Sequence, residues 1–194
     1  MIITRTPYRI SFLGGGSDIA GFYEKSYGKV LSVTIQQYIY ISVHPSFNPN
    51  ETRVKYNRTE VVEDINDLEH PIVRAVLQKL NVCGVEITSV GDIPAQTGLG
   101  SSSSFTVGLL LAVHTYKGEN ISKEDLAREA CEIEIDILRE PIGKQDQYAA
   151  VFGGLRQFTF KADGNVKVET VRMPDNKHME LEESLLLFYT GQTR

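Results

Sequence analysis

The sequence is poor in cysteine, and its two thiols do not form a recognisable metal or redox motif. Cys83 and Cys131 lie far apart in apolar patterns, and the chain has no CxxC spacing. Zinc sites and dithiol redox sites use closely spaced thiols, so both classes of site are disfavoured. We expect both cysteines to be buried, and we expect the chain to fold without a disulfide or a structural metal.

Long apolar runs and clusters of basic residues are also missing. No apolar stretch reaches the length of a membrane span, and residues 1–7 lack the basic region and apolar core of a secretory signal. The formal net charge is −5 and the Lys and Arg residues are scattered, whereas nucleic-acid-binding proteins concentrate basic residues on one surface. These absences predict a cytoplasmic protein that binds neither nucleic acid nor a membrane.

The remaining composition is that of an ordinary globular protein, with 194 residues of which 41% are hydrophobic and 23% charged. That length is sufficient for one sizeable core and the start of a second domain. Alternating apolar positions and β-branched or aromatic residues predict strands at 8–13, 30–35, 38–43, 84–90, 155–160, 166–172 and 185–189. Helices are predicted at 71–81, 102–117, 122–138 and 144–152. The pattern is α+β, without internal repeats.

The last predicted strand, residues 185–189, is strongly apolar, yet only residues 190–194 follow it. An apolar strand is normally paired with other strands. We therefore expect the sequence to stop soon after a second domain begins, with a first domain over 1–180 and the start of the second over 181–194.

The most informative segment is 94–104, where Gly98 and Gly100 precede four consecutive serines. It leads into residues 107–113, which are apolar on every side and predict a buried helix. A helix N-terminus presents unpaired amides and partial positive charge, and glycines let a phosphate approach the backbone. A serine-rich cap on a core helix is the alternative, but one cap does not use four serines. The segment therefore predicts phosphate binding.

Other phosphate and nucleophile motifs are absent. The Walker pattern GxxxxGK[ST] needs Ser or Thr after Gly-Lys, but Val30 and Gln145 occupy those positions. The dinucleotide fingerprint GxGxxG fails because Ile19 stands where the third glycine is needed. No GxSxG elbow occurs around residues 98–104, which disfavours a serine hydrolase.

Two carboxylates in the second half of the chain are candidate functional groups. The apolar stripe of the predicted helix 122–138 consists of Leu126, Ala130, Ile133 and Ile137. Glu134 lies on the edge of that stripe, where it needs a partner unless it reaches solvent. Asp146 lies in the first turn of the predicted helix 144–152, where the helix dipole favours an acid in any case.

Residues 94–104 resemble the phosphate loop P-x-x-x-G-L-G-S-S-[SA] of the GHMP kinase superfamily, which includes galactokinase, homoserine kinase, mevalonate kinase and phosphomevalonate kinase. Residues 7–18 resemble its first motif, a basic residue on a strand followed by a glycine-rich turn and an Asp. A further match is Glu134 followed by Pro141 and residues 143–147. The resemblance covers most of the chain. It implies the superfamily's ATP-binding N-terminal domain over 1–180, similar to ribosomal protein S5 domain 2, with most of the C-terminal domain missing.

The resemblance implies ATP and Mg²⁺ as ligands and assigns roles to individual residues. The implied phosphate-binding residues are Pro94, Gly98, Leu99, Gly100, Ser101, Ser102, Ser103 and Ser104. Ser102 and Glu134 would hold magnesium. Asp146 would accept the proton of the sugar hydroxyl, and Arg9 would stabilise the transferred charge, although Arg9 could instead be a surface cation on a strand. We expect Arg9 and Asp146 to face each other across one cleft.

The substrate implied is a sugar phosphate. Residues 13–18, 141–148 and 188–194 resemble D-glycero-D-manno-heptose 7-phosphate kinases, which phosphorylate the anomeric hydroxyl, and related fucokinases share parts of this pattern. Galactokinases usually carry Gly-Glu-His-Thr-Asp at the turn, so galactose is disfavoured. The implied sugar-binding residues are Gly15, Gly16, Ser17, Asp18 and Arg194. Another GHMP kinase and a non-catalytic nucleotide-binding module remain alternatives.

A phosphorylated sugar also needs a cation for its phosphate group. The candidates are Lys144, Arg156 and Arg194, each of which could equally be a solvated surface residue.

Overall fold

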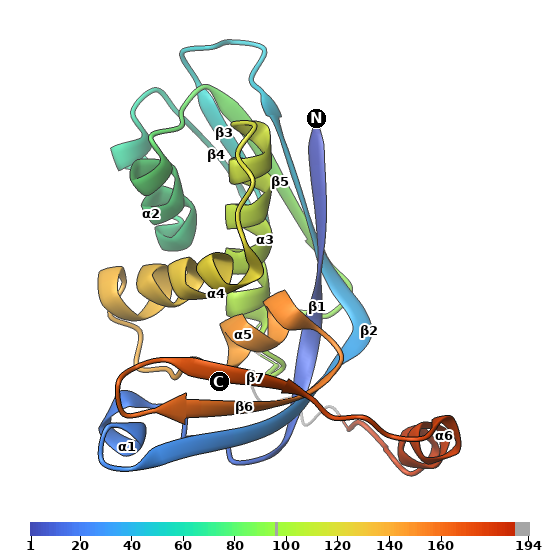
Figure 1. Cartoon of the computed structure of the whole chain (residues 1–194). Coiled ribbons are helices and arrows are strands. Elements are labelled where there is room, and N and C mark those ends of the chain that lie inside the picture. The colour runs from blue at the N-terminus through green and yellow to red at the C-terminus, as the bar shows by residue number, and fades with distance from the viewer. Residues whose placement is uncertain (96, 189–194) are drawn as a thin grey trace.

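The computed structural model describes residues 1–95 and 97–188 (Figure 1). The first half contains β1 (Ile2–Leu13), α1 (Ala20–Tyr23), β2 (Tyr27–Pro45), β3 (Thr52–Lys55), β4 (Thr59–Val62), the short 3-10 helix η1 (Ile65–Asp67), α2 (Pro71–Leu80) and β5 (Val85–Gly91). The second half contains α3 (Ser101–Tyr116), α4 (Lys123–Cys131), the π-helix η2 (Glu132–Ile137), α5 (Gln145–Phe152), β6 (Leu155–Lys161), β7 (Val166–Thr170) and α6 (Asp175–Glu183).

The strands form one seven-stranded sheet with the order β4-β3-β5-β2-β6-β7, and β1 pairs with β2. Strand β2 is the organising element. It pairs with β1 along most of its length, with β6 through residues 27–33, and with β5 through residues 39–45. Thr4, Thr6 and Tyr8 of β1 are buried because α3 packs across β1 and β2 (Figure 1).

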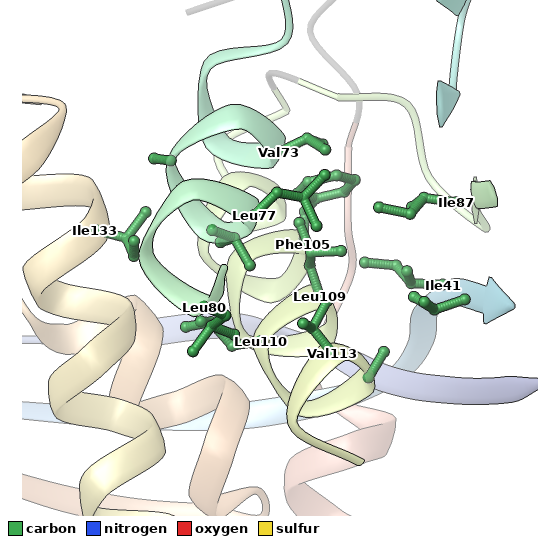
Figure 2. Packing of buried hydrophobic residues seen from close by; sticks show 14 of the residues in the cluster. Ile41, Val73, Leu77, Leu80, Ile87, Phe105, Leu109, Leu110, Val113 and Ile133 are labelled. Atoms are coloured by element: carbon green, nitrogen blue, oxygen red, sulfur yellow. The ribbon is translucent and has the colours of Figure 1, made fainter. Parts of the chain in front are cut away.

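Helix α3 is apolar on all sides and lies at the centre of the main core. Figure 2 shows Phe105, Leu109 and Val113 of α3 between the sheet residues Ile41 and Ile87 and the residues of α2. Helix α2 contributes one apolar face, formed by Val73, Val76, Leu77 and Leu80. Each fully buried aliphatic side chain contributes about 1.5–3 kcal/mol through the hydrophobic effect, so this packing holds the N-terminus of α3 firmly beside β1.

Two predicted strands, 30–35 and 38–43, are parts of the single strand β2. The predicted break coincides with a bulge, since Pro7 pairs with Tyr38 and Arg9 with Thr34, which leaves residues 35–37 opposite Tyr8 alone. The strand continues because β1 supports it on both sides of the bulge. The short strands β3 and β4 and the polar helix α6, which buries no residue, were not predicted.

Two other expectations were wrong. Residues 185–188 form no strand and pair with no strand in the described part of the chain, and Leu185, Leu186, Leu187 and Phe188 are exposed. Residue 189 lies outside that part. Cys83 is exposed, whereas Cys131 is buried as expected, and burial raises the pKa of its thiol. No helix in residues 1–95 and 97–188 combines the length and apolarity needed to cross a membrane.

Candidate active site

The glycine-rich turn after β1 is held against the start of β2. The hydroxyl of Ser17 donates to the carbonyl of Gly14 at 2.7 Å and accepts from the amide of Lys29 at 3.0 Å. Gly15 and Gly16 are exposed at the surface of the turn. The side chain of Ser17 thus stabilises the turn, and the predicted sugar-binding backbone lies on its accessible side.

Asp18 joins this turn to the start of α5. Its carboxylate is 2% exposed and accepts from the amides of Gly16 at 3.0 Å and Gln145 at 3.1 Å. Asp18, Gly16, Gln145 and Asp146 help to line a cavity of about 170 Å³. The turn and the N-terminus of α5 therefore border the same small cavity. A sugar contact of Asp18 stays a prediction, because its oxygens are engaged by backbone donors.

Arg9 and Asp146 lie face to face, which confirms their predicted juxtaposition. Arg9 Nε donates to Asp146 Oδ1 at 2.7 Å and Arg9 Nη2 donates to Asp146 Oδ2 at 2.6 Å, while Arg9 Nη1 donates to the carbonyl of Gly98 at 2.7 Å. The side chains are 13% and 22% exposed. We call Arg9, Asp146, Gly98 and Gly100 the Arg9–Asp146 corner. A bidentate pair fixes the direction of the carboxylate as well as its position.

The predicted phosphate loop forms the start of α3. Gly98 and Gly100 have φ of +78° and +76°, and the helix begins at Ser101. A Cβ on Gly100 would lie 3.2 Å from Arg9 Cγ and 3.4 Å from Asp146 Oδ2. Both the left-handed backbone and the close approach therefore favour glycine at position 100.

The four serines divide into two pairs. Ser101 and Ser102 are accessible, and the first amides of a helix lack intrahelical acceptors, so this end of α3 presents donors to an anion. Ser103 and Ser104 are buried, and the Ser104 hydroxyl donates to the carbonyl of Pro7 at 2.8 Å. The Ser104 amide donates to the carbonyl of Gly100 within the helix. This geometry supports phosphate contacts from residues 98–103 and makes Ser104 a structural residue.

Glu134 lies inside the protein, below the accessible serines. It is 0% exposed and accepts from Ser102 Oγ at 2.7 Å, Ser103 Oγ at 2.7 Å and Gln147 Nε2 at 2.6 Å. Burial raises the pKa of Glu134, although the hydrogen bonds from the serines and Gln147 lower it. We call Glu134, Ser102, Ser103 and Gln147 the Glu134 corner.

The π-helix η2 explains why Glu134 is more deeply buried than the sequence predicted. The amide of Leu138 donates to the carbonyl of Ile133, five residues earlier, which widens the turn. A regular helix would place Glu134 at the edge of the apolar stripe and Ile137 on it. With the wider turn, Glu134 is fully buried and Ile137 is 48% exposed. The expected continuous α-helix over 122–138 is therefore corrected to α4 followed by η2.

The Glu134 corner has the chemistry of a magnesium site that shares its ligands with a phosphate. Its oxygen donors suit a hard cation, and Mg²⁺ in nucleotide enzymes is commonly held by one or two protein oxygens together with phosphate oxygens. The described residues contain no group of three His, Cys, Asp or Glu that could hold a metal by themselves. All three partners of the Glu134 carboxylate are neutral, whereas buried charges are normally paired or bound to a metal. The residues therefore fit magnesium that arrives with a nucleotide.

A larger apolar cavity of about 560 Å³ opens beside the start of α3. Its wall includes Tyr56, His70 and Phe105, together with Ser101 and Ser102. The rings of His70 and Phe105 stack with centroids 4.9 Å apart, and burial lowers the pKa of His70. Sequence analysis missed this cavity because its aromatic residues come from separate elements. The one sequence feature beside this cavity that predicts ligand binding is the glycine- and serine-rich segment 94–104.

The candidate cations for a substrate phosphate are engaged elsewhere or lie outside the described residues. Lys144 Nζ donates to the carbonyl of Gly164 at 3.0 Å and lies 5.1 Å from the centre of the Tyr23 ring. Arg156 Nε donates to the carbonyl of Gly153 at 2.8 Å. Arg194 lies outside the described residues, together with the rest of 189–194.

Residues 67–154 match the family model for the GHMP kinases N terminal domain. The matched range runs from η1 to the end of α5 and its following glycines, so it contains the phosphate loop, Glu134 and Asp146. Arg9 and the glycine-rich turn lie before the matched range and join the site through the sheet.

The chain is 31% identical over 206 residues to the D-glycero-alpha-D-manno-heptose 7-phosphate kinase of Campylobacter jejuni, covering 100% of this chain and 60% of that protein. It is 26% identical to the galactokinase of Pyrococcus furiosus, covering 100% of this chain and 54% of that protein. A crystal structure of a D-glycero-D-manno-heptose 1-phosphate kinase from Bacteroides thetaiotaomicron has 28% identity and a TM-score of 0.87, with 95% of this chain and 64% of that chain covered. This similarity confirms the predicted α+β fold. The chain spans less than two thirds of the length of each of these relatives.

Proposed function

Since the chain belongs to the GHMP kinase family, we propose that it is the ATP-binding part of a kinase that phosphorylates D-glycero-D-manno-heptose 7-phosphate at the anomeric hydroxyl. The observation that carries this proposal is the convergence, at the start of α3, of the accessible serines, the buried Glu134 carboxylate and the Arg9–Asp146 pair. Phosphoryl transfer depends on positioning and charge neutralisation, and these groups supply both.

The nucleotide is positioned by two adjoining features. The cavity lined by Tyr56, His70 and Phe105 is apolar and of a size that suits a nucleoside. Ser101 and Ser102 are among the residues that line this cavity, so a nucleoside bound there has its phosphates within reach of the N-terminus of α3. The cavity and the phosphate loop thus form one continuous nucleotide site.

Magnesium would be held by Ser102 and Glu134 together with phosphate oxygens. When bound, it supplies positive charge that neutralises the β- and γ-phosphates during transfer. Glu134 contributes a buried negative charge that has only neutral donors around it. Ser102 lies between that carboxylate and the surface, so its hydroxyl is the first protein oxygen that a nucleotide-bound cation reaches.

Asp146 accepts the proton of the sugar hydroxyl, and the oxygen then attacks the γ-phosphorus as ADP leaves. The Arg9 guanidinium holds the Asp146 carboxylate in one orientation through two hydrogen bonds. Because Arg9 lies beside the phosphate loop, it also offers positive charge to the transferred group. The sugar occupies the small cavity lined by Gly16 and Asp146.

The sugar phosphate is the most specific part of the proposal. It is supported by the resemblance in the turn at 13–18 and by the relatives from C. jejuni and B. thetaiotaomicron, whose names both specify heptose phosphates. The similarity to a galactokinase supports phosphorylation of another sugar as the alternative. A non-catalytic module is disfavoured, because a nucleotide binder has no use for an aspartate held by Arg9 beside the phosphate loop. A cytoplasmic location and a domain boundary near residue 180 remain part of the proposal.

Kinetics of the full-length enzyme on heptose with and without the 7-phosphate test the substrate class. Loss of a charge-assisted contact costs about 1.5–3 kcal/mol, so kcat/KM should fall about tenfold or more without the phosphate. Asp18→Ala should raise KM for the sugar and spare ATP. Equal kcat/KM for the two sugars would refute the sugar-phosphate assignment and leave the kinase assignment standing. Absence of ATP consumption with any sugar would refute the kinase assignment.

A further inference from the structure

We propose that Gln147 is a positioning residue that holds the Glu134 carboxylate toward the phosphate loop and thereby sets the affinity for magnesium-bound nucleotide. This inference rests on the proposed function, in which Glu134 is the magnesium carboxylate. The role concerns the metal half of the site, and Gln147 itself contacts neither the metal nor the phosphates.

The contact is short and completely enclosed. Gln147 Nε2 donates to Glu134 Oε2 at 2.6 Å, and both residues are 0% exposed. Ser103 donates to the same Oε2 atom at 2.7 Å, whereas Ser102 donates to Oε1 at 2.7 Å. Oε2 is therefore held by two buried donors, and Oε1 is directed toward the accessible serine. Removal of the Gln147 donor would release the carboxylate from this orientation.

The other end of the amide suggests a role other than packing. Gln147 Oε1 is buried and has no hydrogen-bond partner among the described residues. An unpaired buried acceptor is unfavourable, and an apolar side chain of similar length would fill the same volume without one. Among residues 1–95 and 97–188, the one polar contact that Gln147 makes with another side chain is the donation to Glu134. The amide of Gln147 is thus explained by the hydrogen bond that it donates to the Glu134 carboxylate.

Gln147 also connects the two corners of the site through α5. Asp146 precedes it in the chain and pairs with Arg9, whereas Gln147 points into the Glu134 corner. The first turn of α5 therefore orients the base with one residue and the metal carboxylate with the next. Both corners are held at a fixed separation by one short piece of helix.

The decisive variant is Gln147→Met, which keeps an unbranched side chain of similar length and removes the donor. In the full-length protein, ATP binding is measured by calorimetry with excess Mg²⁺ and again with EDTA. We expect the magnesium-dependent gain in ATP affinity to fall about 10–100-fold, the range typical of residues that orient a metal ligand. Affinity for metal-free ATP should stay unchanged, because Gln147 does not line the nucleotide cavity.

A matched control separates this effect from general destabilisation. Thr4 is also buried, and its hydroxyl donates to the carbonyl of Gly108 at 2.9 Å, away from both corners. Thr4→Val should lower the thermal unfolding temperature without changing the magnesium-dependent gain in affinity. If Gln147→Met does not fold, Gln147→Asn keeps the amide but is too short to reach Glu134, and it should show the same loss.

The possible outcomes separate a failure of the Gln147 positioning role from a failure of the magnesium role of Glu134. If wild-type protein binds ATP equally well with Mg²⁺ and with EDTA, the magnesium role of Glu134 is refuted. If wild-type protein shows the magnesium gain and the folded Gln147 variant retains all of it, Gln147 is a structural residue and the inference alone is overturned. If the variant weakens binding equally with and without Mg²⁺, the positioning role is likewise overturned.

Discussion

The Arg9–Asp146 corner and the Glu134 corner each place one carboxylate beside the start of α3, in contrasting environments. Asp146 is partly accessible and is held by a guanidinium at 2.7 and 2.6 Å. Glu134 is fully buried and is held by two hydroxyls and an amide. One carboxylate already has its cation, whereas the other is surrounded by neutral donors.

This difference suits the two carboxylates to the different tasks that we propose for them. A base must meet the substrate, and Asp146 lines the small cavity that Gly16 of the glycine-rich turn also lines. A metal carboxylate must retain a charge that the incoming cation neutralises, and the neutral surroundings of Glu134 leave that charge uncompensated. The same α3 N-terminus serves both, because Gly100 adjoins one corner and Ser102 belongs to the other.

The largest effect is expected when the carboxylate of Asp146 is replaced. Asp146→Asn keeps the shape but removes the proton acceptor, so kcat of the full-length enzyme should fall by a factor on the order of 10²–10⁴ with ATP affinity nearly intact. Steady-state kinetics and ATP titration measure the two quantities. Asp136→Asn, at an exposed position of η2, is the control and should behave as wild type. Normal turnover of Asp146→Asn would remove Asp146 from the mechanism.

A smaller effect is expected on the Glu134 side. Ser102→Ala removes a hydroxyl that donates to Glu134 and that we assign to magnesium. Loss of one charge-assisted contact costs about 1.5–3 kcal/mol, so half-saturation by Mg²⁺ should shift upward about tenfold. A magnesium titration of ATP binding measures the shift. An unchanged titration curve would exclude Ser102 as a ligand.

Gly100→Ala is expected to lower the stability of the protein and to affect the two corners unequally. The left-handed backbone at φ +76° costs an alanine about 1–2 kcal/mol, and the added Cβ would lie 3.2 Å from Arg9 Cγ. Urea denaturation should therefore show a loss of roughly that size. The Arg9–Asp146 corner should be disturbed more than the Glu134 corner, so kcat should fall while the magnesium titration stays unchanged. A variant as stable as wild type would contradict the backbone argument.

The smallest expected effect is the dependence of stability on pH at the Glu134 corner. Burial raises the pKa of Glu134, so the folded protein binds this proton more tightly than the unfolded chain does. Its contribution to the free energy of unfolding is present at low pH and declines as the pH rises from the unfolded value, about 4.3, through the raised folded value. Subtracting the denaturation curves of a Glu134→Gln variant isolates this contribution in metal-free protein. A difference that is constant with pH would show that Glu134 titrates normally.

The sequence predicted those parts of the site that depend on local pattern. The glycines and serines before an apolar helix indicated the start of α3, and the three motifs predicted which segments converge. Local pattern could not reveal the π-turn of η2, because its widened hydrogen bonding depends on how Glu134 is accommodated beneath the serines. It also could not reveal that Ser103 and Ser104 are buried, because a run of four identical residues does not indicate which of them face the core.

The errors in the fold have a similar origin. The bulge in β2 looked like an interruption because Gln36 and Gln37 are polar, yet β1 pairs with the strand before and after it. Residues 185–188 looked like a strand because they are apolar, but strand formation also needs a neighbour. The larger apolar cavity combines residues from β1, β5 and α3 with Tyr56 and His70, and such a combination arises only in the folded chain.

Strand β2 pairs with β6 near its start and with β5 near its end, and this affects how the sheet can unfold locally. Neither β5 nor β6 pairs with residues 34–38, but the amide of Thr34 donates to the carbonyl of Gly154 and the amide of Tyr38 donates to Asp92 Oδ2. Strand β1 pairs with β2 on both sides of this gap. Opening of β2 at either end therefore also disturbs the β1–β2 pairing. Backbone amides of β2 should therefore exchange their hydrogens as one cooperative unit. The β5 end and the β6 end of the strand would then lose their protection together.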